Sequence, residues 1–136
     1  MQQKKISSAW LIDDDKIYLF GLRKMIEISK RCDSITEFSN GSEAIRKLQT
    51  MVDSPELLPD IIFLDINMPV MDGWQFLTAF DLLKKQLSRQ IIIYMISSSI
   101  DDRDIERAKQ LDAVKNYIIK PLPFDKLQSI FANEIQ

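Results

Sequence analysis

The amino-acid sequence predicts an α/β protein built on one parallel sheet of five strands, doubly wound with five helices. Five short apolar runs alternate with five amphipathic helical patterns, an order that is typical of a parallel sheet covered on both faces. The third run, Ile61 to Leu64, has no polar alternation, as expected of a strand buried on both sides. No internal repeat or linker divides the 136 residues, so we expect one domain over residues 1–136 with a core of about 7–135.

The composition excludes several classes of function. Charged residues make up 28% of the chain and hydrophobic residues 46%, which is typical of a globular protein. The net charge of −2 provides no field to attract nucleic acid, so we expect no direct binding to DNA. Cys32 is the single cysteine and excludes an intramolecular disulfide, and the absence of histidine excludes Ser-His and Cys-His nucleophile pairs.

The amino-terminal segment shows no targeting pattern. The apolar residues between Ile6 and Ile12 are interrupted by serines and run directly into aspartates. This is neither a signal peptide nor a membrane span. We therefore expect a cytoplasmic protein without membrane insertion.

The first predicted strand, Ala9 to Ile12, ends in three consecutive aspartates, Asp13 to Asp15. A helix is expected directly after them, because apolar residues recur at helical spacing at Leu19, Leu22 and Ile26. Asp14 or Asp15 can accept hydrogen bonds from the first free amides of this helix. Capping explains one of the three carboxylates and leaves two side by side without a structural reason.

The second strand is predicted at Ser34 to Phe38, and a turn then leads into a helix with Ala44, Ile45 and Leu48 on one face. The central strand follows at Ile61 to Leu64 and ends at Asp65, since Pro69 and the Asp72-Gly73 turn prevent its extension. A helix of about four turns is expected next, with an apolar face of Phe76, Phe80, Leu83 and Leu87. Three cations lie near its end, where they complement the helix dipole: Lys84, Lys85 and Arg89.

The fourth strand is predicted at Ile91 to Ile96 and stops at Ser97. The polar segment from Asp101 to Leu111 is expected to form a weakly packed helix, because its apolar stripe is thin: Ile105, Ala108 and Leu111. Tyr117 to Ile119 is the fifth strand and ends at Lys120-Pro121. A closing helix follows, with Pro123 near its first turn and an apolar face of Leu127, Ile130 and Phe131.

Polar side chains follow four of the five predicted strands: Asp13 and Asp14, Asp65, Ser97 and Lys120. Because parallel strands point the same way, we expect these groups to converge at the carboxyl edge of the sheet. Clustered carboxylates that leave room for water and a phosphoryl oxygen suit Mg²⁺, and the lysine and hydroxyl can bind further phosphoryl oxygens. The pattern predicts phosphoryl transfer to Asp65, with the ion and Lys120 offsetting the charge of the transferring group.

These motifs resemble the receiver domains of two-component response regulators, and the resemblance covers nearly the whole chain. LIDDD is similar to the acidic pair of the family and assigns that role to Asp13 and Asp14. FLDINMPVMDG is similar to the phosphoacceptor strand and loop, with Asp65 as the acceptor. By the same resemblance, the backbone carbonyl of Asn67 binds the metal ion together with the three aspartates.

The resemblance also assigns roles at the last two strands. Ser97 matches the hydroxyl at the end of the fourth strand, and IIKP matches the lysine of the family as Lys120. Tyr117, three residues before this lysine, matches the switch aromatic. The bond between Lys120 and Pro121 is expected to be cis by the same likeness. Phosphorylation is then expected to move Ser97 and Tyr117 and to change the face formed by the 101–111 helix, the fifth strand and the closing helix.

In functional terms the resemblance implies a stand-alone, single-domain response regulator of a phosphorelay, with a flavodoxin-like, CheY-like fold and the strand order 2-1-3-4-5. A sensor histidine kinase or a histidine phosphotransfer protein would donate the phosphoryl group, with Mg²⁺ or Mn²⁺ bound, and a downstream protein target would read the result. Such a protein is bacterial and cytoplasmic, and is a monomer or a phosphorylation-dependent dimer. It is not an enzyme beyond its own phosphorylation and dephosphorylation.

Three other functions are weighed against this one. An Asp-nucleophile, Mg²⁺-dependent phosphohydrolase of the haloacid-dehalogenase type needs an aspartate two residues after the nucleophile, where this chain has Asn67, which cannot shuttle a proton. A nucleotide-binding flavodoxin-like domain needs a glycine-rich loop, and the three glycines form none. A docking-only receiver has no support, because every group that phosphorylation needs is present.

Overall fold

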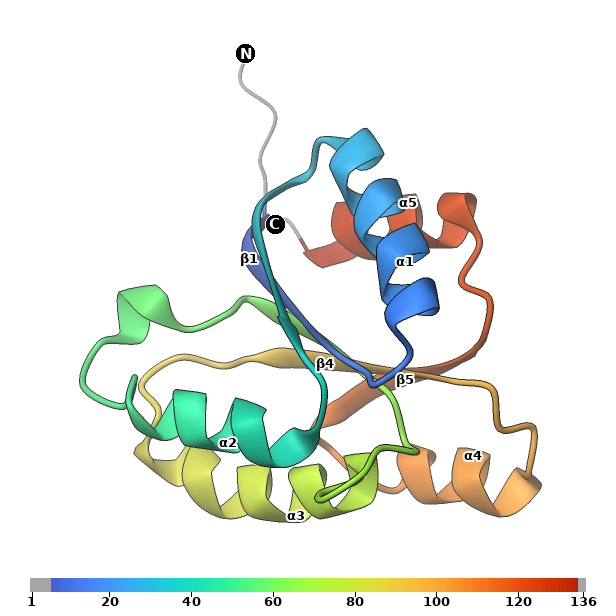
Figure 1. The fold of residues 1–136 in the computed structure, drawn as a ribbon. Coiled ribbons are helices and arrows are strands. Elements are labelled where there is room, and N and C mark those ends of the chain that lie inside the picture. Colours follow the sequence, from blue (N-terminus) through green and yellow to red (C-terminus); the bar gives the residue numbers. More distant parts are fainter. Residues whose placement is uncertain (1–5, 135–136) are drawn as a thin grey trace.

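The computed structural model describes residues 6–134 and contains a five-stranded parallel sheet in the order β2-β1-β3-β4-β5 (Figure 1). This confirms the predicted fold class and strand order. The strands are β1 (Ile6–Ile12), β2 (Cys32–Phe38), β3 (Ile61–Leu64), β4 (Ile92–Ser97) and β5 (Val114–Ile119). The helices are α1 (Lys16–Ser29), α2 (Gly41–Gln49), α3 (Gly73–Leu83), α4 (Asp102–Lys109) and α5 (Phe124–Glu134), with short 3-10 helices η1 (Pro55–Leu57) and η2 (Lys84–Gln86).

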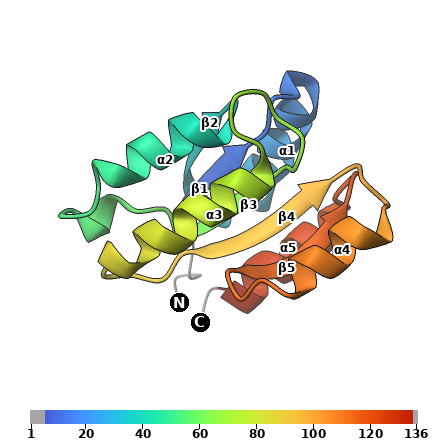
Figure 2. The ribbon, with the colours of Figure 1, turned by 90° about the horizontal axis from the view of Figure 1, so that it is seen from below.

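The helices form two layers with the sheet between them. α1 and α5 cover one face, and α2, α3 and α4 cover the other; the view from below shows α3 between α2 and α4 (Figure 1, Figure 2). Each layer closes its own apolar core against the sheet. β3 serves both cores, because Ile61 and Phe63 point toward α1 and α5 whereas Ile62 and Leu64 point toward α2 and α3. All four residues are buried, as their continuous apolar run predicted.

Three strands begin earlier than predicted, because the backbone ladder continues through residues with exposed polar side chains. β1 begins at Ile6 and the edge strand β5 at Val114, and β2 begins at Cys32. The carboxylate of Asp60 holds the start of β1 by accepting from the amide of Ser8 at 3.1 Å. β4 lies one residue later than predicted at both ends.

α3 differs most from its prediction. It begins at Gly73, directly after its N-cap, and ends at Leu83 instead of extending to Leu87. The chain then tightens into η2, which satisfies the last carbonyls with shorter-range hydrogen bonds and contains the two predicted lysines. Arg89 lies beyond the helix, where its guanidinium pairs with Asp60. It therefore does not cap the helix dipole as predicted.

The other helix ends settle what the sequence left open. Asp15, and not Asp14, caps α1, since it accepts from the amides of Ile17 and Tyr18 at 3.1 Å. α5 begins immediately after Pro123. α4 is three residues shorter than predicted, because Asp101 is its N-cap and the helix ends at Lys109. Within α4 only Ala108 is fully buried, in agreement with its thin apolar stripe.

Among residues 6–134, no helix combines the length and apolar character that a membrane span requires.

Candidate functional site

Three carboxylates meet at the carboxyl edge of the sheet, where the sequence placed them. Asp13 and Asp14 follow β1, Asp65 follows β3, and these strands are neighbours in the sheet. The amide of Asp65 still bonds to the carbonyl of Ile12 at 2.9 Å, so the ladder fixes the backbone at the site. One carboxylate oxygen from each aspartate lies within 4.8 Å of the others. Asp13 and Asp65 are buried, and Asp14 is exposed to solvent.

Backbone amides orient the two buried carboxylates. Asp13 Oδ1 accepts from the amide of Asp15 at 2.9 Å, and Asp65 Oδ1 accepts from the amide of Ile66 at 2.8 Å. The other oxygen of each side chain faces the ammonium group of Lys120, at 2.8 Å from Asp13 Oδ2 and 3.7 Å from Asp65 Oδ2. Lys120 therefore lies closer to Asp13 than to the predicted acceptor.

The carboxylates and the lysine change one another's ionisation. Burial, followed by the negative charge of Asp13, raises the pKa of Asp65 to about 6, although Lys120 acts in the opposite direction. Burial acts to lower the pKa of Lys120, but its hydrogen bond to Asp13 and the charges of both aspartates outweigh burial, so this pKa is raised. One cation among three carboxylates leaves an excess of negative charge at the site.

The donor set fits Mg²⁺ on two grounds. All three ligand candidates are hard carboxylate oxygens, and the exposure of Asp14 leaves the site open to water. Beyond the effect of burial, the charge of Asp13 raises the pKa of Asp65 more than Lys120 lowers it, and a divalent cation would offset this remaining repulsion. Asn67 is exposed in the loop, two residues beyond Asp65 in the chain.

The loop between Asp65 and α3 is held by two backbone hydrogen bonds, one to the start of α3 and one to the start of α2. The amide of Gly73 donates to the carbonyl of Ile66 at 2.7 Å, and the amide of Gly41 at the start of α2 donates to the carbonyl of Met71 at 3.0 Å. Val70 has a φ of 68°, a left-handed conformation that β-branched residues rarely adopt. No turn residue such as glycine or asparagine stands at this position, so the sequence did not indicate the left-handed conformation.

The two predicted switch residues contact the same neighbour, Ser99. The Oγ of Ser97, fully buried at the end of β4, accepts from the amide of Ser99 at 3.1 Å. The hydroxyl of Tyr117, which is half-buried on β5, donates to the carbonyl of Ser99 at 2.8 Å. The Oγ of Ser99 in turn donates to Asp104 of α4 at 2.7 Å. Ser99 thus links both predicted switch residues to α4, a role that the sequence could not distinguish within three consecutive serines.

A second residue that the sequence did not indicate is Tyr18 on α1. Its ring centroid lies 4.3 Å from the Nζ of Lys120, and its hydroxyl accepts from the amide of Leu122 at 3.3 Å. The bond between Lys120 and Pro121 is cis, as the resemblance implied. Tyr18 lies in the first turn of α1, directly after the aspartates that follow β1, but the sequence does not indicate its contact with Lys120.

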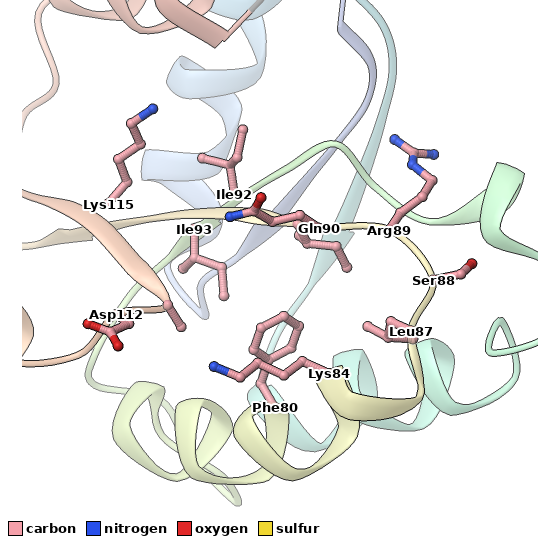
Figure 3. A pocket seen from close by; sticks show the side chains of 12 residues that line it. Phe80, Lys84, Leu87, Ser88, Arg89, Gln90, Ile92, Ile93, Asp112 and Lys115 are labelled. Atoms are coloured by element: carbon pink, nitrogen blue, oxygen red, sulfur yellow. The ribbon is translucent and has the colours of Figure 1, made fainter.

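A hollow of about 680 Å³ lies at the opposite edge of the sheet, between the end of α3 and the starts of β4 and β5 (Figure 3). Phe80 and Ile93 face each other across it, while Lys115 and Arg89 point away from it (Figure 3). The cations of its rim are already paired, Lys84 with Asp81, Arg89 with Asp60 and Lys115 with Glu134. None of the predicted site residues lines it, so its chemistry is separate from that of the acidic cluster.

Comparison with known proteins agrees with this geometry. The response regulator receiver domain family matches residues 9–132. The nitrate/nitrite response regulator protein NarL of Escherichia coli (strain K12) is 29% identical over 131 residues, which are 96% of this chain and 56% of NarL, so the chain spans about half the length of this relative. A two-component response regulator from Cytophaga hutchinsonii is 34% identical, with a TM-score of 0.82 over 96% of this chain and 98% of that one.

The solved Mn(2+)-bound form of the response regulator Rcp1 shares the fold, with a TM-score of 0.76 and 20% identity over 96% of this chain and 95% of that one. The resemblance seen in the sequence motifs is therefore confirmed by comparisons over almost all of the chain. On the strength of a family match from residue 9 to residue 132, this chain belongs to the response regulator receiver domains.

Proposed function

We propose that this chain accepts a phosphoryl group on Asp65 in a Mg²⁺-dependent reaction and transmits the change through a protein-interaction face. The position of Asp65 carries the proposal. Asp65 is buried, one of its carboxylate oxygens lies within 4.8 Å of an oxygen of Asp13 and of Asp14, and it approaches the same lysine as Asp13. Mn²⁺ can replace Mg²⁺ because both ions accept oxygen ligands, and the structural neighbour Rcp1 has been solved in a Mn(2+)-bound form.

In the transfer step an oxygen of the Asp65 carboxylate forms a bond to phosphorus, and the bond from phosphorus to the donor breaks. With a phosphohistidine donor, the leaving group is an imidazole nitrogen. Asp65 attacks as the carboxylate, and a pKa of about 6 leaves it mostly ionised at neutral pH. The three aspartates and the backbone carbonyl of Asn67 would hold Mg²⁺, which would supply the positive charge that the phosphoryl oxygens need.

Two protein groups are placed to bind the transferred group. The ammonium of Lys120 is 3.7 Å from Asp65 Oδ2, beyond a strong hydrogen bond, so the N–H on this side remains available to a phosphoryl oxygen. The hydroxyl of Ser97 accepts from Ser99, and its own proton is available to donate to the same group. Both residues stand at ends of neighbouring strands, where backbone pairing holds them.

The signal is expected to leave the site through Ser97, Tyr117 and α4. If Ser97 moves toward the phosphoryl group, its bond to Ser99 is strained, and Ser99 also holds Tyr117 and Asp104. α4 contributes a single fully buried residue to the core, so a shift of this helix has a low energetic cost. The face that changes comprises α4, β5 and α5.

The donor we propose is a sensor histidine kinase or a histidine phosphotransfer protein, and the reader is a downstream protein. In this proposal the chain is not an enzyme acting on a separate substrate; it catalyses at most its own phosphorylation and dephosphorylation. The phosphohydrolase alternative gains no support, since Asn67 is the residue two positions beyond Asp65 and cannot act as a general acid.

Phosphorylation by a small donor tests the proposal. Incubation of the protein with acetyl phosphate or phosphoramidate and Mg²⁺ should give a single phosphate adduct by intact mass spectrometry. The adduct should be lost in base, as an acyl phosphate is, and should not form in excess chelator. An adduct that forms equally well without a divalent cation would exclude the proposed reaction.

Metal binding and phosphoryl binding should be separable by substitution. Asp14→Ala removes an exposed ligand oxygen and is expected to weaken Mg²⁺ binding on the order of tenfold or more. Lys120→Met removes a positive charge beside the remaining carboxylates, so Mg²⁺ affinity should stay the same or rise while phosphorylation slows. Titration of Mg²⁺ against the fluorescence of Trp74, in the helix after the acceptor loop, measures the Mg²⁺ affinity of both variants. A Lys120 variant that loses Mg²⁺ affinity as badly as the Asp14 variant contradicts these roles.

The extent of the switch can be mapped by NMR with the acyl-phosphate mimic beryllofluoride. Chemical-shift changes are expected to extend from Asp65 through Ser97, Ser99 and Tyr117 into α4, because hydrogen bonds connect the last three to that helix. Ser99→Ala, which removes the bond to Asp104, should reduce the changes in α4 and leave those around Asp65 intact. Changes confined to the metal site would show that Tyr117 has a structural role only.

A further inference from the structure

Tyr18 of α1 contacts Lys120, the residue to which the proposed function assigns the binding of phosphoryl oxygens. We propose that Tyr18 is a positioning residue for Lys120. Its ring holds the ammonium group of Lys120 so that one N–H of this group stays directed at Asp65. The inference rests on the proposed phosphorylation of Asp65, because Lys120 matters there as the group that binds the phosphoryl oxygens. It is carried by two contacts of Tyr18, one through its ring and one through its hydroxyl.

The ring contact accounts for the direction of the lysine. An ammonium group has three donors and no preferred plane, so by itself it can rotate freely. Here one donor reaches Asp13 Oδ2 at 2.8 Å, and the ring centroid of Tyr18 lies 4.3 Å from Nζ, inside the range of a cation–π interaction. The direction that remains leads toward Asp65 Oδ2 at 3.7 Å. The side chain of Lys120 is 14% exposed, so little water competes for these positions.

The hydroxyl contact fixes the ring itself. The Tyr18 oxygen accepts from the amide of Leu122 at 3.3 Å, across 104 residues of chain. Leu122 is two residues beyond Lys120, on the far side of Pro121, so the bond ties α1 to the segment that carries the lysine. Burial raises the pKa of Tyr18, so its hydroxyl is a neutral phenol at neutral pH. Tyr18 therefore contacts Lys120 directly and holds the following segment through Leu122.

NMR of the metal-free protein tests the contact without any phosphorylation. In the wild type, the ε-methylene protons of Lys120 should be shifted upfield, because they are next to Nζ, which lies over the Tyr18 ring. Tyr18→Leu should remove this upfield shift, and Tyr18→Phe should keep it, since the ring remains. Phe20→Leu is the matched control: Phe20 is exposed on the same helix and contacts a different lysine, Lys24, at 5.4 Å. It should leave the Lys120 signals unchanged.

Phosphorylation kinetics test what the contact does. With acetyl phosphate and saturating Mg²⁺, Tyr18→Leu should reduce the maximal rate of adduct formation by about three- to tenfold, as expected for the loss of one cation–π contact, with unchanged Mg²⁺ affinity. Tyr18→Phe should restore most of the rate, and Phe20→Leu should match the wild type. Tyr18→Met provides a second non-aromatic variant in case the leucine variant does not fold, and thermal unfolding identifies such a failure.

Any of three results would overturn the inference. The Lys120 NMR signals of folded Tyr18→Leu or Tyr18→Met could match those of the wild type, or Tyr18→Phe could be phosphorylated as slowly as Tyr18→Leu. The third is a loss of Mg²⁺ affinity in Tyr18→Leu that equals its loss of phosphorylation rate. The failure of the proposed function is distinct from these. If the wild type takes up no phosphate at all, phosphorylation of Asp65 is wrong, while the NMR comparison still decides whether Tyr18 positions Lys120.

Discussion

Gly73→Ala is expected to destabilise the protein by about 2–4 kcal/mol and to disrupt the acceptor loop. A Cβ atom at this position would overlap the backbone carbonyl oxygen of Asp65 and lie 2.9 Å from the Cα of Ile66. Both are backbone atoms, and the amide of Asp65 is bonded to the carbonyl of Ile12 at 2.9 Å, so neither can move aside as a flexible side chain would. The amide of Gly73 also bonds to the carbonyl of Ile66 at 2.7 Å, and relief of the overlap would break this bond.

Urea unfolding of the metal-free protein measures this effect, with Gly21→Ala as the matched control. Gly21 lies inside α1, and a Cβ atom there would have no neighbour within 4 Å. Alanine at this helical position should therefore stabilise the protein by about 0.5–1 kcal/mol. A Gly73→Ala protein whose free energy of unfolding lies within about 1 kcal/mol of the wild type would show that the loop can move, contrary to the packing described here.

Asp65→Asn is expected to stabilise the metal-free protein at pH 7 by about 1–2 kcal/mol, although it removes the phosphoacceptor. The pKa of Asp65 is raised to about 6 by burial and by Asp13, so the folded state binds a proton more tightly than the unfolded state does. The stability of the wild type therefore falls as the pH rises from about 4 to about 6, relative to the asparagine variant. Below pH 4 the two proteins should have similar stability.

The measurement is a series of urea unfolding curves between pH 4 and pH 7 in the presence of a chelator, for both proteins. Asp53→Asn serves as the control for the loss of a carboxylate, because Asp53 is exposed and does not belong to the acidic cluster. Mg²⁺ at pH 7 should raise the stability of the wild type more than that of Asp65→Asn. A wild type that gains stability relative to the variant as the pH rises would mean that Lys120 outweighs Asp13.

Much of this site could be predicted because parallel strands bring their carboxyl ends together. The run from Ile61 to Leu64 identified β3 with its observed bounds, and its end placed Asp65 beside Asp13. Lys120 could be placed for the same reason, as the residue that ends the fifth apolar run. The prediction depended on strand direction, which follows from the alternation of apolar runs and helical patterns, and on strand order, which the resemblance to receiver domains implied.

The features that could not be predicted depend on distances between elements. The ring of Tyr18 reaches Lys120 because α1 packs beside the end of β5, and no local pattern indicates that contact. Ser99 meets Tyr117 for the same reason. The early start of β5 was missed because an edge strand can include polar residues, such as Asn116, without an apolar pattern. The end of α3 was missed because a 3-10 turn continues the apolar spacing beyond the helix.

The central claim is that Asp65 takes up the phosphoryl group. It is tested most directly by mapping the adduct: the protein is phosphorylated with acetyl phosphate and Mg²⁺, the acyl phosphate is trapped by borohydride reduction, and the modified residue is identified by tandem mass spectrometry. The account predicts modification at Asp65 in the wild type and no adduct in Asp65→Asn, with Asp53→Asn modified like the wild type. Modification at Asp13 or Asp14 in the wild type, or an adduct that persists in Asp65→Asn, would contradict it.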